Sequence, residues 1–211
     1  HRKFEDLAII YRWNVGVDSN GLYTNIVTNE FAEKIGKSEE ELYRLAKENT
    51  NRIFPSEVRN MAEVISEIIF GEDGELLPED EEFRNMMTET PDDKSMYVIT
   101  NKSKLFGAAA MLYEENLYDL SQQLDSDLYI LPSSTHEVIA ISDKFGDANE
   151  LADMVYEINM DQVELSDRLS NQVYHYDKDA RTLRLATNKF ERTISDDIKE
   201  KVPEIEEGKA R

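Results

Sequence analysis

The sequence predicts an α+β protein, and three observations lead to this class. Apolar residues alternate along several short segments, as in half-buried strands, and they recur every three to four residues along others, as in amphipathic helices. These segments form two runs that are separated by a strongly acidic stretch. We therefore expect four parts, packed as one unit: residues 1–70, an acidic connector at 71–94, residues 95–187 and a polar tail at 188–211.

The first part should begin with a β-hairpin. Residues 4–15 alternate as one extended strand, in which Trp13 is predicted to anchor the core. The segment Asp18-Ser-Asn-Gly21 is typical of a turn, and residues 22–27 form the returning strand.

Three helices should follow the hairpin. Thr28 or Asn29 can cap a short helix that stops near residue 36. Ser38 and Glu41 have the spacing of a capping box, which predicts a second helix to about residue 47. Ser56 is predicted to cap a third helix, which ends before Gly71. Its apolar stripe should face the core and consists of Val58, Met61, Ala62, Ile65, Ile68 and Ile69.

The second large part reads as βαββαβ, the order of a ferredoxin-like unit, with one extra strand. Strands are predicted at 96–100, 128–131, 138–141 and 173–176, and the extra strand at 183–185. One helix should span 107–124. The other should start after Asp147 and bury a stripe of Leu151, Met154, Val155 and Ile158.

Charge and composition narrow the classes of function. The chain has 45 acidic and 24 basic side chains, a formal charge of −21, which repels nucleic acid and anionic membranes and leaves a protein partner open. Ten of the acids lie between residues 71 and 93 beside one Arg84, as in a solvated connector. The absence of cysteine excludes thiol chemistry and zinc–thiolate sites, and it fits a reducing, cytoplasmic location. No apolar run has the ~20 residues of a membrane span.

The segment from Asp127 to Ser142 is the most informative one, because two apolar strands meet there at a polar turn. Its Pro-Ser-Ser-Thr-His-Glu sequence offers Ser134 and His136 as a catalytic pair. Strand parity places these two residues on one face and Glu137 on the other, so the acid that orients His136 would have to come from elsewhere. The alternative is a turn held together by serine and threonine hydrogen bonds to the backbone.

Two further candidate sites are weaker. His136 and Glu137 could bind a metal with His175 and Asp177, although their spacing matches no standard ligand motif. Lys102 and Lys104 precede a predicted helix and could hold an anion at its N-terminus, although a surface loop explains them as well. The sequence assigns no cofactor.

An ordered set of short motifs carries a family resemblance, which spans about residues 3–178. The motifs are Asp6-Leu-Ala-Ile-Ile-Tyr-Arg12, Ala46-Lys-Glu-Asn-Thr50, Met96-Tyr-Val-Ile-Thr-Asn101, Gly107-Ala-Ala-Ala110, Leu131-Pro-Ser-Ser-Thr-His-Glu-Val138, Met154-Val-Tyr-Glu-Ile-Asn159 and Leu169-Ser-Asn-Gln-Val-Tyr174. The sequence resembles an uncharacterised bacterial family, domain of unknown function 5688, and is more distantly similar to YtpQ-type uncharacterised proteins. The resemblance implies no activity, substrate or cofactor. It does imply a longer N-terminus, so we expect a chain that starts at His1 to be trimmed.

Two functional hypotheses follow. The first is a non-enzymatic interaction or binding module, since no complete catalytic constellation can be picked out. The alternative is a hydrolase or metal-dependent enzyme centred on the Pro-Ser-Ser-Thr-His-Glu hairpin.

Overall fold

A computed structural model describes residues 1–18, 21–70, 82, 91, 94–132 and 134–187, and it confirms the α+β class. The N-terminal elements are β1 (Arg2–Phe4), β2 (Leu7–Ile9), β3 (Arg12–Asp18), β4 (Gly21–Ile26), α1 (Asn29–Lys34), α2 (Glu39–Ile53), β5 (Ser56–Asn60) and α3 (Met61–Phe70). They are followed by β6 (Met96–Asn101), the 3-10 helix η2 (Gly107–Leu112), α5 (Glu114–Leu124), β7 (Leu128–Leu131), β8 (Val138–Ser142), the 3-10 helix η3 (Asp143–Phe145), α6 (Ala148–Gln162), β9 (Tyr174–Asp177) and β10 (Thr182–Leu185).

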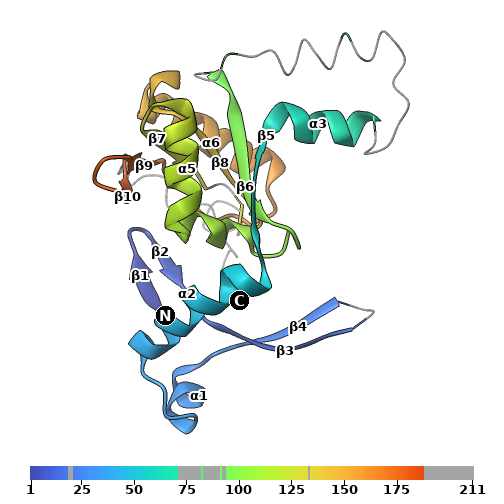
Figure 1. Cartoon of the computed structure of the whole chain (residues 1–211), viewed down its shortest axis with the longest axis vertical. Helices are drawn as coiled ribbons and strands as arrows, with labels where there is room; N and C mark the ends of the chain where they lie inside the picture. Colours follow the sequence, from blue (N-terminus) through green and yellow to red (C-terminus); the bar gives the residue numbers. More distant parts are fainter. Residues whose placement is uncertain (19–20, 71–81, 83–90, 92–93, 133, 188–211) are drawn as a thin grey trace, which may run out of the picture.

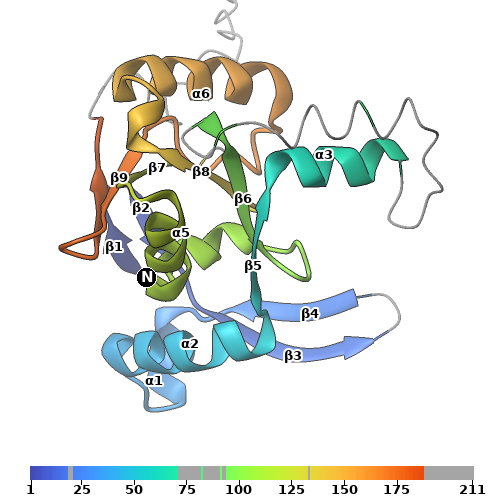
Figure 2. The ribbon, with the colours of Figure 1, turned by 45° about the horizontal axis from the view of Figure 1, so that its top comes forward.

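The main sheet has six antiparallel strands in the order β10-β9-β7-β8-β6-β5. Helix α5 covers one face and α6 the other, which gives three layers (Figures 1 and 2). The side chains of β7 alternate accordingly. Leu128 and Ile130 belong to the core cluster that contains Leu117 and Leu120 of α5, whereas Leu131 packs in the cluster of α6. The apolar β7 is therefore covered on both faces, as expected of a central strand.

The elements occur along the chain in the predicted βαββαβ order, with β10 as the extra strand, but their order in space differs from a ferredoxin-like sheet. In that fold the fourth strand lies beside the first and both helices cover one face. Here β5 pairs with β6 from Ser56 to Asn60 and occupies that position. Strand β9 pairs with β7 instead, and its connection through α6 covers the opposite face.

The predicted single strand at 4–15 is wrong, because the chain reverses at Glu5 and Asp6 to form the hairpin β1–β2. Glu5 has a φ of 52°. Asp6 accepts hydrogen bonds from the hydroxyl groups of Ser170 and Tyr174, which link this turn to the end of the main sheet. The predicted hairpin with its turn near residues 18–21 is present as the ribbon β3–β4.

Trp13 is not the predicted core anchor, since it is 50% exposed. The ribbon β3–β4 has two strands and projects from the body of the molecule, and in the described part of the chain the ring of Trp13 makes an edge contact with Phe31. Alternation of apolar residues predicted the strand correctly. It did not show how much of Trp13 stays exposed.

The first two predicted helices are confirmed by their caps. The Thr28 hydroxyl accepts the Phe31 N–H, and Ser38 with Glu41 forms the capping box of α2, which extends beyond the predicted end to Ile53. Helix α6 begins after Asp147, as predicted. Its Leu151 and Val155 are buried, but Ile158 is exposed.

The third predicted helix is partly wrong. Residues 56–60 form β5, because the open edge of β6 offers five consecutive backbone pairs, and α3 begins only at Met61. Only part of the apolar stripe faces the core, since Val58 packs against the main core cluster from β5. Ile68 is 79% exposed and Ile69 is also exposed, since α3 extends away from the end of β5 and packs on one side only.

The predicted helix at 107–124 is divided into η2 and α5 by Tyr113, whose backbone is extended. The amide of Asn116 donates to the carbonyl of Ala110 and fixes this break. The acidic connector and the polar tail lie outside the described residues, apart from Glu82, Pro91 and Lys94. Among the helices of the described part, none has the length and apolar content needed to cross a membrane.

Candidate functional site

The turn between β7 and β8 is built into the surrounding backbone. Thr135 donates its N–H to the carbonyl of Asp167 at 2.7 Å, and Ser134 forms an isolated β-bridge with Arg168. The Thr100 hydroxyl donates to the carbonyl of His136 at 2.8 Å. Ser133 of the same turn lies outside the described residues. The turn is thus held by loop 164–170 and by β6.

Ser134 and His136 are close in the chain, but the contacts of their side chains differ from those of a catalytic pair. A serine nucleophile needs an imidazole nitrogen at its hydroxyl. Here Ser134 is only 7% exposed, and its Oγ accepts the backbone N–H of His136 at 3.0 Å. The imidazole Nε2 lies 3.7 Å from Oδ1 of Asp167. The carboxylate that faces His136 therefore comes from elsewhere in the chain and not from Glu137.

The two internal histidines lie at opposite ends of the β7–β8 hairpin. His175 is opposite Tyr129 near the start of β7, and Tyr129 is opposite Ile141. Three strand residues, ~10 Å, separate that level from the start of β8, and His136 lies beyond it. Asp177 accepts the N–H groups of Asp179 and Ala180 within the β9–β10 turn. The structure thus does not bring the predicted metal ligands together.

Lys102 and Lys104 are exposed in the loop after β6. The Lys102 N–H donates to the carbonyl of Pro55 at 3.0 Å, which holds the loop against the end of α2. The helix that follows is the 3-10 helix η2 of six residues, too short to provide a developed helix dipole. The geometry adds no support to an anion site here.

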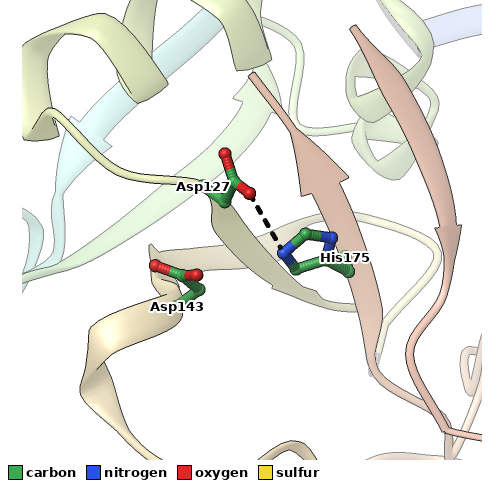
Figure 3. A group of neighbouring side chains, drawn as sticks. All are labelled: Asp127, Asp143 and His175. Carbon is green, nitrogen blue, oxygen red and sulfur yellow. Dashed lines mark ion pairs between the residues drawn. The ribbon is translucent and has the colours of Figure 1, made fainter. Parts of the chain in front are cut away.

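A different group of side chains converges at the open end of the hairpin (Figure 3). Asp127 immediately precedes β7, Asp143 immediately follows β8, and His175 lies in β9. One ligand atom from each residue lies within 4.8 Å of the other two. His175 Nε2 is 3.5 Å from Asp127 Oδ2. We call these three residues the Asp–Asp–His cluster.

Local contacts fix each member of the cluster. Oδ1 of Asp127 accepts the backbone N–H of Lys178 at 3.0 Å, which leaves Oδ2 for His175. The backbone N–H of Asp143 donates to the carbonyl of Asp127 at 3.0 Å, so the two acidic residues are held side by side. The ring of Tyr129 meets the imidazole of His175 edge-on, with centroids 5.7 Å apart. The cluster is therefore ordered by the fold and not only by its own attractions.

The two neighbouring lysines, Lys144 and Lys178, contact Asp125 and not the cluster. Lys178 Nζ lies 2.8 Å from Oδ1 of Asp125, which lowers the pKa of Asp125 and raises that of Lys178. Lys144 Nζ donates to the carbonyl of Asp125. Within the described residues, no lysine or arginine side chain forms an ion pair with Asp127 or Asp143. Burial raises the pKa of Tyr129, and the negative charge of Asp143 raises it further.

Comparison with known protein families identifies the family of this chain. Residues 1–178 match the model described as Family of unknown function (DUF5688). The chain belongs to this family. The matched region includes the whole Asp–Asp–His cluster and ends before β10. No curated protein gave a significant match, and no solved structure did.

The cluster of this DUF5688 chain fits a metal ion by its donor types and nearly by its spacing. In a tetrahedral site with bonds of ~2.1 Å, ligand atoms lie about 3.4 Å apart. His175 Nε2 and Asp127 Oδ2 have about this separation at 3.5 Å, and a ligand atom of Asp143 lies within 4.8 Å of those of the other two residues. One imidazole nitrogen and two carboxylate oxygens suit first-row divalent ions such as Zn²⁺ and Mn²⁺, better than an all-oxygen ion such as Ca²⁺.

Sequence reasoning missed Asp127 and Asp143, although both border the hairpin that it singled out. A signal was present, because an acid directly before one strand of a hairpin and an acid directly after the other must lie side by side. What could not be seen was the third strand. The pairing of β9 with β7, which brings His175 to these acids, is set by the order of strands in the main sheet.

Proposed function

We propose that this DUF5688 protein is a non-enzymatic binding module that holds a first-row divalent metal ion in the Asp–Asp–His cluster. One observation carries the proposal: three potential ligand atoms from three separate segments lie within 4.8 Å of one another. Because no lysine or arginine side chain of the described residues forms an ion pair with Asp127 or Asp143, a cation would relieve the repulsion between the two carboxylates.

The bound ion would also have a structural effect. It would join the start of β7, the end of β8 and the middle of β9, three segments that the chain otherwise holds by backbone pairing. The cluster therefore supports binding linked to stability. With free Zn²⁺ at 100 times its dissociation constant, the linkage adds about 2.7 kcal/mol. For a chain of this size that corresponds to a rise of roughly 5–10 °C in Tm.

Thermal unfolding and calorimetric titration with Zn²⁺, Mn²⁺ and Mg²⁺ test the proposal. We expect Zn²⁺ to bind with the highest affinity and Mg²⁺ to leave Tm unchanged. Asp143→Asn and His175→Gln should abolish the response to Zn²⁺. Asp125→Asn is the matched control, since it removes a neighbouring carboxylate that contributes no ligand atom, and it should respond like the wild type.

Mn²⁺ provides a local readout, because its unpaired electrons broaden nearby resonances. We expect selective broadening of the amide signals of Asp127, Tyr129, Asp143 and His175. Binding of equal strength in the wild type and in Asp143→Asn would overturn the proposal, since the ions would then be held by other acids. Protonation of the ligands competes with the metal, so binding should weaken as the pH falls.

A metal-dependent enzyme is the second candidate, because three protein ligands leave a coordination position open, as in catalytic zinc sites. Hydrolysis of 4-nitrophenyl esters or phosphate esters by the Zn²⁺-loaded protein, and not by Asp143→Asn, would favour it. A hydrolase built on Ser134 and His136 has less support, given the contacts of the serine hydroxyl. We place the protein in the cytoplasm, on its cysteine-free sequence. We propose neither nucleic acid nor an anionic membrane as its partner, on its net charge of −21.

A further inference from the structure

A pocket of about 440 Å³ lies between helix α2 and the segment where η2 is followed by α5. One wall consists of Lys47, Glu48, Asn51 and Arg52, whose spacing places them on one side of α2. The other wall consists of residues 112–115. Helix α2 runs past the end of α5 in both views (Figures 1 and 2). The volume is within the range of roughly 300–1,000 Å³ that is usual for small-molecule sites.

The wall from α2 carries two positive charges without an acidic partner. Neither Lys47 nor Arg52 forms an ion pair in the described part of the chain. Arg52 Nη2 donates to the neutral amide oxygen of Asn49 at 2.9 Å. The acid of this wall, Glu48, is paired with Arg44 at 2.9 Å, on the preceding turn of the helix. The charge that α2 offers to a ligand is therefore positive.

The opposite wall offers a negative charge and a hydroxyl group. Glu114 lies 3.8 Å from Arg181, whereas Glu115 forms no ion pair among the described residues. Burial raises the pKa of Tyr113 to about 12, so its hydroxyl group stays protonated at neutral pH and can donate a hydrogen bond. Charges of opposite sign thus line the same pocket without pairing across it.

This distribution of charge favours a ligand with both an anionic and a cationic end. A simple anion would meet Glu115 and the long-range repulsion of a chain with a formal charge of −21. A simple cation would meet Lys47 and Arg52. In a free amino acid both charges are attached to one carbon, whereas each residue of an extended peptide separates its ends by a further ~3.5 Å. Leu112 and the ring of Tyr113 offer apolar contact to a side chain between the two ends.

We propose that this pocket binds di- or tripeptides with free termini. The C-terminal carboxylate pairs with Lys47 and Arg52, and the N-terminal ammonium group pairs with Glu115. The hydroxyl group of Tyr113 donates to a carbonyl oxygen of the peptide. Capture of a terminal charge is a recurrent mode of peptide recognition. The pocket contains no residue of the Asp–Asp–His cluster, so peptide binding does not depend on the metal ion.

Calorimetric titration of the full chain tests the proposal with tripeptides Ala-X-Ala, in which X is alanine, leucine, phenylalanine, aspartate or lysine. We expect the tripeptides with an apolar X to bind most tightly. N-acetylation and C-terminal amidation each remove one charged contact, so each should weaken binding about tenfold. Free leucine and inorganic phosphate are the comparison ligands, and both should bind more weakly than the tripeptides.

Two variants assign the orientation of the peptide. Glu115→Gln should bind the unmodified tripeptide about tenfold more weakly and should no longer distinguish it from the acetylated form. Lys47→Gln should lose the distinction between the carboxylate and the amide in the same way. Both residues are exposed, so circular dichroism should show wild-type helix content for both variants. Glu157→Gln is the matched control, since it removes an exposed carboxylate from α6, and Asp143→Asn should also bind like the wild type.

Three outcomes would overturn the proposal. The first is equal binding of the blocked and unblocked tripeptides, which would show that the terminal charges are not recognised. The second is tighter binding of phosphate or free leucine than of any tripeptide. The third is the absence of heat from all the tripeptides at millimolar concentration. Peptide binding that persists in a protein without a response to Zn²⁺ would support this pocket and contradict only the metal site.

Discussion

Gly107→Ala tests whether the β7–β8 turn is packed against η2 as closely as the structure places it. A Cβ atom at Gly107 would lie 2.1 Å from Oγ1 of Thr100 and 2.2 Å from the carbonyl oxygen of His136. These two atoms are themselves joined by a hydrogen bond of 2.8 Å. The methyl group would break this bond and also meet the backbone nitrogen of Asn101 at 3.0 Å. Because two of the three obstacles are backbone atoms, rotation of a side chain cannot relieve the clash.

The magnitude follows from two terms. Loss of the hydrogen bond costs about 1 kcal/mol, and overpacking against backbone costs about 1–3 kcal/mol. The expected loss of unfolding free energy is thus roughly 2–4 kcal/mol, or roughly 4–16 °C in Tm for a chain of this length. The sign is informative, since glycine to alanine without a clash usually stabilises by about 0.4–1 kcal/mol through the unfolded state.

Urea unfolding followed by circular dichroism, together with thermal unfolding, measures the change. Gly146→Ala is the matched control, because its backbone is extended with φ of 174° and nothing lies within 4 Å of its Cβ position. We expect this control to stay within about 0.5 kcal/mol of the wild type or to exceed it slightly. Equal stability of the two variants would refute the close packing of η2 against the turn.

Two further predictions concern the N-terminal part. Hydrogen bonds from the Ser38 backbone and then from Lys37 lower the pKa of Glu41 to about 2. Since this is below the ordinary value of 4.5, the contribution of Glu41 to stability is complete above pH 4.5 and is lost as the pH falls towards 2. Urea unfolding at a series of pH values should therefore show a smaller loss over this range for Glu41→Gln than for the wild type. Asp6→Ala removes the acceptor of two hydroxyl groups, one of them on the fully buried Tyr174, and should cost about 2 kcal/mol. In a Tyr174→Phe background the same change should cost at least 1 kcal/mol less, and additive effects in this double-mutant cycle would contradict the link.

The sequence predicts local structure best where one chain segment contains the whole reason for it. The capping box of Ser38 and Glu41 needs only four residues, and α2 begins where it predicts. The apolar run at 128–131 forms β7, covered on both faces. In each case a short-range pattern and the tertiary contacts favour the same element.

Prediction fails where a distant segment decides the structure. Residues 56–60 fit a helical stripe through Val58, yet they form a strand because the edge of β6 is available for pairing. A local signal supports this boundary, since the side chain of Asn60 accepts the Ala62 N–H and caps α3. The exposure of Trp13 and Ile68 has the same origin: apolar periodicity shows which side chains share a face, but not whether another layer lies against that face.

The candidate site follows the same rule, because the two ends of the hairpin differ in the polar groups that they leave without a backbone partner. Polar residues in a tight turn often form hydrogen bonds with the backbone. The Ser134 hydroxyl accepts the His136 N–H, and the Thr135 N–H donates to the carbonyl of Asp167. At the open end of the hairpin, Asp127 and Asp143 are held side by side by a backbone hydrogen bond. Each of them offers a carboxylate oxygen as a possible metal ligand. A third strand is then required to supply a different ligand type, and the pairing of β9 with β7 brings His175 there. A metal site with ligands from three elements is therefore best sought at the open end of a hairpin, opposite its turn, where a neighbouring strand can supply the third ligand.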